Sequence, residues 1–345
     1  MLKISLDKLD DLFAKIARDR KLYLPVMRGD QADFGLWTPG TSVCLDYLNT
    51  ARSIKDFFLP QTENIASFKR EGKNLSVIPN QEAPAPFVVF GARGCDVRAL
   101  DVLDRVFLSE PVDIFYKAQR ENGVILALAC AEPEETCFCA VFGIDATEPL
   151  GDVVMRIVGD TLFWEAKTPA GEALSNTLKD VLSEADSADN AKAEEHRKAG
   201  KSALEELPLS GLSLDGWDEK DLLEKFDSEL WSKMSHACVG CGTCTYVCPT
   251  CQCYDIQDFD AGHCVKRFRC WDSCMFSDFT LMAHGNPRKS QLERFRQRFM
   301  HKLVYFPANN DGMYSCVGCG RCLMKCPVSM NIVKVIKALG GNKNV

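Results

Sequence analysis

The 345-residue sequence has no long hydrophobic run. Its longest apolar stretches, at residues 87–90 and 123–131, are far shorter than the roughly 20 residues that cross a bilayer. The first residues, MLKISLDKLDDLF, are interrupted by Asp7, Asp10 and Asp11, so they lack the apolar centre of a secretory signal. We therefore expect a cytoplasmic protein without a membrane span.

An excess of positive charge is also missing. The chain has 41 Lys and Arg against 48 Asp and Glu, a net charge of −7, which argues against nucleic acid as a partner. A strand, a turn and a helix are predicted at residues 87–106, but the turn reads GARGCD and lacks the G-x-G-x-x-G of a dinucleotide-binding loop. No phosphate loop or nucleophile–base pair is recognisable, so no flavin or NAD site is evident.

Cysteine, in contrast, is abundant, with 18 residues. Residues 238–249 read CVGCGTCTYVCP, and residues 316–327 read CVGCGRCLMKCP. Both have the C-x2-C-x2-C-x3-C-P spacing of two-cluster ferredoxins, in which three cysteines hold one cubane and the fourth ligates the other. The runs predict two [4Fe-4S] clusters, the first on Cys238, Cys241, Cys244 and Cys326, and the second on Cys316, Cys319, Cys322 and Cys248.

Zinc knuckles are the alternative interpretation of these runs. Zinc sites also use short cysteine spacings, but they need only four ligands in all. Eight cysteines in two matching runs, each followed by proline, favour iron-sulfur clusters. Glycines between the cysteines support this, because glycine reaches backbone conformations that let a loop wrap tightly around a cluster.

Four further cysteines follow two predicted strands of the N-terminal half. Cys95 comes after the strand at residues 87–90, whereas Cys130, Cys137 and Cys139 come after the strand at residues 124–129. Ligands of open α/β sheets bind at the carboxyl ends of strands. We favour a third iron-sulfur cluster on these four cysteines; a zinc site or buried free thiols remain the alternatives.

A third group of cysteines lies between the two ferredoxin runs. The motifs CPTCQC and CWDSC contribute Cys251, Cys253, Cys270 and Cys274, and their spacings resemble those of metal ligands. No fixed pattern requires a metal there. Structural thiols packed beside the clusters are the favoured interpretation, and a further metal centre is the alternative.

The hydrophobic patterning divides the chain into two unlike parts. Strands alternate with helices over residues 1–170, and a hairpin is expected at residues 153–165, which predicts an α/β domain. Residues 171–220 are acidic, with few aromatics, as in an exposed helical linker. Helical periodicity then returns at residues 222–234, 291–303 and 331–339, the last stopped by Gly340 and Gly341, so residues 221–345 are predicted to form a mainly α-helical ferredoxin-type domain.

The segment at residues 51–60 mixes basic and aromatic side chains. We expect Phe57 and Phe58 in the core and Arg52 and Lys55 on the surface. A contact with a partner or a cofactor is the alternative.

With these motifs the chain resembles the iron-sulfur beta subunits of cytoplasmic sulfhydrogenases and the iron-sulfur subunit of anaerobic sulfite reductase; similar subunits accompany heterodisulfide-reductase-like complexes. The resemblance extends over nearly the whole chain and includes the RGCD motif at residues 93–96, residues 130–139, both insert motifs and both ferredoxin runs. One departure is HGNPR at residues 284–288, where the family has a glycine-rich His-Asn-Phe-Arg segment.

The resemblance implies a protein that relays electrons between a subunit that binds flavin and NAD(P)H and a catalytic subunit of hydrogenase, sulfite-reductase or heterodisulfide-reductase type. A catalytic reductase is the alternative, with an open iron site or a flavin in the N-terminal domain. A purely structural role, in which the metals only stabilise the fold, is disfavoured, because it would not need the crossed ligand pattern of two ferredoxin runs.

Overall fold

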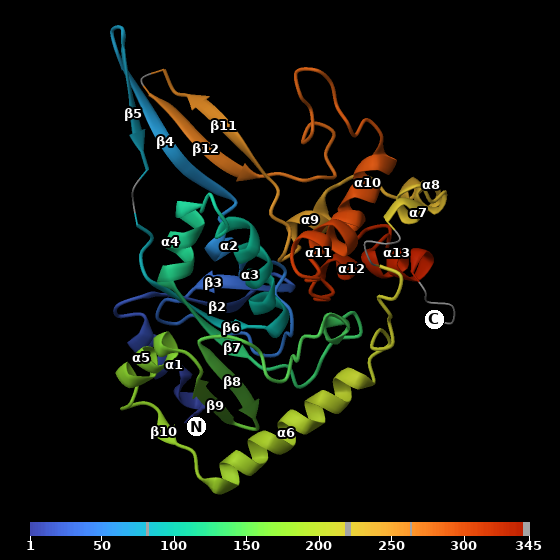
Figure 1. Ribbon diagram of the computed structural model, residues 1–345. Helices are drawn as coiled ribbons and strands as arrows, with labels where there is room; N and C mark the ends of the chain where they lie inside the picture. Colours follow the sequence, from blue (N-terminus) through green and yellow to red (C-terminus); the bar gives the residue numbers. More distant parts are fainter. Residues whose placement is uncertain (81–82, 218–221, 263, 341–345) are drawn as a thin grey trace.

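An eight-stranded sheet forms the centre of the N-terminal half in the computed structural model, which describes residues 1–80, 83–217, 222–262 and 264–340 (Figure 1). The strand order is β10-β1-β9-β8-β7-β6-β2-β3. The strands are β1 (Leu2–Ser5), β2 (Lys21–Arg28), β3 (Gln31–Leu36), β6 (Phe87–Ala92), β7 (Gly123–Leu128), β8 (Val153–Val158), β9 (Thr161–Ala166) and β10 (Ser183–Glu184). The predicted hairpin is β8–β9, so the expectation of an α/β region is confirmed.

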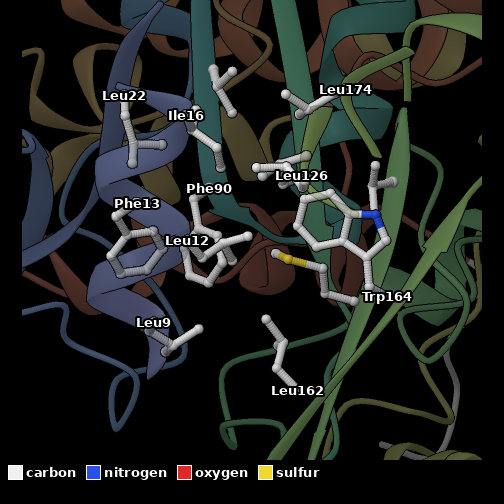
Figure 2. Packing of buried hydrophobic residues seen from close by; sticks show 14 of the residues in the cluster. Leu9, Leu12, Phe13, Ile16, Leu22, Phe90, Leu126, Leu162, Trp164 and Leu174 are labelled. Atoms are coloured by element: carbon white, nitrogen blue, oxygen red, sulfur yellow. The ribbon is translucent and has the colours of Figure 1, made fainter. Parts of the chain in front are cut away.

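Helices cover both faces of this sheet. A 3-10 turn (Leu6–Lys8), α1 (Leu9–Ile16) and α5 (Pro169–Thr177) pack on one face, where Phe13, Phe90 and Trp164 form a core (Figure 2). The helices α2 (Lys55–Phe58), α3 (Gly94–Phe107) and α4 (Ile114–Asn122) cover the other. Because strands β2, β6, β7 and β8 are parallel neighbours, the carboxyl ends of β6 and β7 lie at the same edge.

A second, four-stranded sheet joins the two halves of the chain. Its order is β11-β12-β4-β5, with β4 (Thr62–Glu71) and β5 (Asn74–Pro79) from the N-terminal half and β11 (Tyr254–Asp260) and β12 (Val265–Trp271) from the insert between the ferredoxin runs. This hairpin differs from the expectation of a mostly helical insert. It is stabilised by pairing with β4, a partner that is distant in sequence.

The C-terminal part is mainly helical, as predicted. It contains α9 (Thr243–Tyr246), α10 (Gln291–Met300), a π-helix (His301–Tyr305), α11 (Phe306–Asn309), α12 (Arg321–Met324) and α13 (Ile332–Leu339). The helix expected at residues 222–234 is instead two short helices, α7 (Leu222–Phe226) and α8 (Leu230–His236). Their core surrounds Trp231, Phe295 and Phe299.

The segment between the two parts is only partly exposed. The long helix α6 (Ser187–Glu205) crosses from the sheet toward the helical part (Figure 1), and it is largely exposed. Leu174 and Leu178, in contrast, are buried in the core of the sheet. The predicted boundary at residue 220 and the stop at Gly341 lie outside the described residues. No described helix is long and apolar enough to cross a membrane.

Candidate iron-sulfur centres

The two ferredoxin runs fold into matching loops, each opening a short helix. Gly242, before α9, has φ +74°, and Gly320, before α12, has φ +75°. A Cβ at Gly242 would lie 2.6 Å from the Phe276 ring, and one at Gly320 would lie 2.7 Å from the Thr136 carbonyl oxygen. Both the backbone conformation and the close packing therefore require glycine at these turns.

The four predicted ligands of the first cluster line one cavity. Cys238, Cys241 and Cys244 come from the first run and Cys326 from the second, and together they border a space of about 390 Å³. Two sulfurs receive hydrogen bonds, from Gln291 Nε2 to Cys238 Sγ at 3.4 Å and from the Met330 N–H to Cys326 Sγ at 3.2 Å. Cys241 is exposed, so this site lies at the surface.

The predicted ligands of the second cluster are more enclosed. Burial raises the pKa of Cys322 to about 12 and that of Cys316 further still, and the neighbouring Cys248 acts in the same direction on both. The pKa of Cys319 is raised by the same two causes. Lys302 Nζ lies 3.5 Å from Cys248 Sγ and donates to Thr250 Oγ1 at 2.8 Å. Cys248 therefore sits among the cysteines of the other run, as the crossed ligand pattern requires.

The four N-terminal cysteines line a second, small cavity. Cys95 lies in the first turn of α3, Cys130 and Cys137 lie in the loop after β7, and Cys139 begins a 3-10 helix (Cys139–Phe142). All four are buried, and burial raises the pKa of Cys137 to about 11 and that of Cys139 to about 12. A thiol with a raised pKa keeps its proton unless a cation replaces it. Four such thiols around one cavity suit an iron-sulfur cluster, which is wider than a single ion and whose irons would replace the thiol protons.

The N-terminal site and the second ferredoxin loop are in direct contact. Cys319 lines the N-terminal cavity as well, and the Phe138 N–H donates to the Gly318 carbonyl at 2.9 Å. Behind them, Arg321 donates to both carboxylate oxygens of Asp96, at 2.6 and 3.0 Å, and both side chains are buried. The three cysteine sites therefore follow one another, from the N-terminal site through the second to the first.

Three of the insert cysteines lie near one another, and the fourth lies apart. Cys274 is in contact with Cys253 and interacts with Cys251, which is also in contact with Cys248. Cys270 lies on β12 opposite Asp255 and has the carboxylates of Asp255 and Asp272 beside it. Within the described ranges, no three His, Cys, Asp or Glu side chains are arranged to hold one metal ion.

Lys55 contradicts the expectation of a surface position. The side chain is buried, and Nζ donates to the carbonyls of Cys248 and Cys251 at 3.0 and 2.9 Å and lies 3.6 Å from the centre of the Trp271 ring. These contacts compensate the loss of water around the ammonium group. Phe58 is in the core and Arg52 is partly exposed, as predicted.

Sequence reasoning missed two other buried cations at these sites. Arg298 and Lys302 are only 3 and 4% exposed, although both belong to a segment whose periodicity predicted an amphipathic helix with a polar face. Periodicity assigns a charged side chain to the polar face, and that face meets solvent only when no loop covers it. Here the ferredoxin loops cover it.

This arrangement defines a dicluster iron-sulfur protein. Residues 237–330 match the family model of the 4Fe-4S dicluster domain, which implies two [4Fe-4S] clusters. Over 340 residues, the chain is 30% identical to sulfhydrogenase 2 subunit beta from Pyrococcus furiosus, and the match covers 97% of both chains. The chain therefore belongs to the family of sulfhydrogenase beta subunits, and the resemblance seen in its motifs is confirmed.

Proposed function

We propose that this chain is the electron-transfer subunit of a multi-subunit oxidoreductase of the cytoplasm. The observation that carries the proposal is the continuous series of three four-cysteine sites. Each bound [4Fe-4S] cluster would supply one-electron chemistry, and its potential would depend on charge, hydrogen bonds and exposure. The protein's own residues hold the sites in contact, bury all four cysteines of the N-terminal site and leave the outer site at the surface.

We propose one set of four cysteine ligands for each of the three sites. The first cluster takes Cys238, Cys241, Cys244 and Cys326, the second takes Cys316, Cys319, Cys322 and Cys248, and a third takes Cys95, Cys130, Cys137 and Cys139. Four-cysteine ligation leaves no iron open to a substrate. This favours electron transfer over a catalytic reductase with an open iron site.

Both ends of the series are suited to partners. At the first site, Cys241 and Val239 are exposed. At the other end, an open cleft lies at the carboxyl ends of β6 and β7 and shares Leu48 and Arg93 with the wall of the N-terminal cavity. We propose that two partners dock at these two ends: a subunit that binds flavin and NAD(P)H, and a catalytic subunit of hydrogenase, sulfite-reductase or heterodisulfide-reductase type. Anaerobic co-purification from the native source tests the choice of partners.

Substitution of Cys95 tests the N-terminal cluster. The Cys95→Ser variant is expected to lose about four iron atoms per chain, because a serine oxygen is a poor ligand for this cluster, and to keep the C-terminal pair. Cys44→Ser is the matched control, since Cys44 contacts Met27 Sδ and no predicted ligand. Iron and acid-labile sulfide analysis measures the effect. Unchanged iron content in Cys95→Ser would refute this ligand set.

A further inference from the structure

Two buried cations lie beside the C-terminal cluster sites without a carboxylate partner among the described residues. In the part of the chain that the structure describes, Arg298 and Lys302 form no ion pair with Asp or Glu, and the negative groups that raise their pKa are cysteines. A buried charge without a counter-charge is strongly unfavourable. The thiolates of the bound clusters would therefore provide the compensating negative charge.

Arg298 faces the ligands of both sites. It lines the cavity of the first site, and the cysteines that interact with its charge are Cys244 of the first site, Cys322 and Cys248 of the second, and the insert residue Cys251. Its Nε atom is buried and has no hydrogen-bond partner among the described residues. The guanidinium carbon lies 4.5 Å from the centre of the Phe299 ring, which limits where the group can move.

Two neighbouring cations differ from Arg298. Lys302 contacts the second site only, through Cys248 Sγ, and is also bound to Thr250 Oγ1 and the Ser315 carbonyl. Arg321 lies between the second site and Cys95, but its charge is neutralised by the two hydrogen bonds to Asp96. Among these three cations, only Arg298 both lies near the two C-terminal sites and lacks a carboxylate partner.

We propose that Arg298 is a shared counter-charge that raises the reduction potentials of both C-terminal clusters together, while Lys302 raises that of the second alone. Reduction adds negative charge to a four-thiolate site, and a cation within a few ångströms in a low-dielectric region stabilises it. This inference depends on the proposed electron-transfer function. Arg298 is accordingly not a cluster ligand; it acts on the clusters through its positive charge.

The test is a redox titration of the anaerobic holoprotein, followed by electron paramagnetic resonance. Arg298→Gln is expected to shift the midpoint potentials of both C-terminal clusters to more negative values. Arg298→Lys, which keeps the charge, should restore much of the difference. Arg296→Gln is the matched control, because Arg296 stacks on the Phe226 ring at 3.5 Å and donates to the Phe226 carbonyl.

Unchanged midpoints in Arg298→Gln, at full iron content, would overturn the inference. If Arg298→Gln does not retain its clusters, Lys302→Gln is the deciding variant. It should make the midpoint potential of the second cluster more negative and leave that of the first cluster unchanged. An unchanged midpoint potential of the second cluster would overturn the proposal. Wild-type protein without acid-labile sulfide would instead refute the proposed function itself, so the two failures are distinguishable.

Discussion

At the scale of single residues, the buried pair of Asp96 and Arg321 ties the two parts of the chain together. Asp96 follows Cys95, and Arg321 precedes Cys322, so the pair connects the N-terminal site to the second ferredoxin loop. Each side chain is 1% exposed, and Arg321 Nε also donates to the Thr50 carbonyl at 2.9 Å. The pair holds two sites in place that are distant in sequence.

Removing one member of this pair should be costly. Asp96→Asn leaves the Arg321 charge buried without its partner, so we expect the free energy of unfolding to fall by about 3 kcal/mol. Urea denaturation followed by circular dichroism measures the loss. Asp101→Asn is the control, because its pair with Arg98 is partly exposed and should contribute no more than about 1 kcal/mol. Equal effects of the two substitutions would contradict this account.

At the scale of elements, the cluster loops depend on left-handed glycines in tight contact. Gly320 packs against the backbone of Thr136, so the turn before α12 fits only if the N-terminal loop lies where it does. The turn therefore positions two cysteine sites at once, Cys319 on one side and Cys137 on the other.

Gly320→Ala is expected to lower the iron content by roughly one or two clusters, because the added Cβ would overlap the Thr136 carbonyl. Gly312→Ala is the matched control. Gly312 has a similar φ of +79° but has no atom within 4 Å of an added Cβ. Iron analysis of both variants separates backbone strain from overlap. Equal losses of iron in the two variants would mean that backbone strain, and not overlap with Thr136, causes the loss.

Local sequence patterns predicted many of these elements. Periodicity located α10 and α13, and the hairpin expected at residues 153–165 is β8–β9. The hairpin β11–β12 was missed, because all residues of β11 are exposed and the pairing that stabilises it comes from β4. Patterns of burial within one segment cannot report a partner strand that is far away in the chain.

At the scale of the whole molecule, the sheet β11-β12-β4-β5 and the cluster sites join both halves into one unit. Arg269 of β12 is buried in ion pairs with Glu63 and Asp113 of the N-terminal half. Cysteine spacing predicts the members of each site, and the cysteines proposed for the first cluster and for the N-terminal cluster each line one cavity. Cysteine spacing was not enough to predict the spatial order of the three sites, because that order follows from tertiary contacts. Examples are the contact of Phe138 with Gly318 and that of Cys319 with the N-terminal cavity.

The central claim is that three cysteine sites hold clusters in one continuous path. Its most direct test is iron and acid-labile sulfide analysis of oxygen-free wild-type protein, together with electron paramagnetic resonance of the reduced form. The account predicts about twelve iron and twelve sulfide per chain and reduced [4Fe-4S] signals broadened by coupling between neighbours. Colourless protein that contains zinc and no sulfide would contradict it.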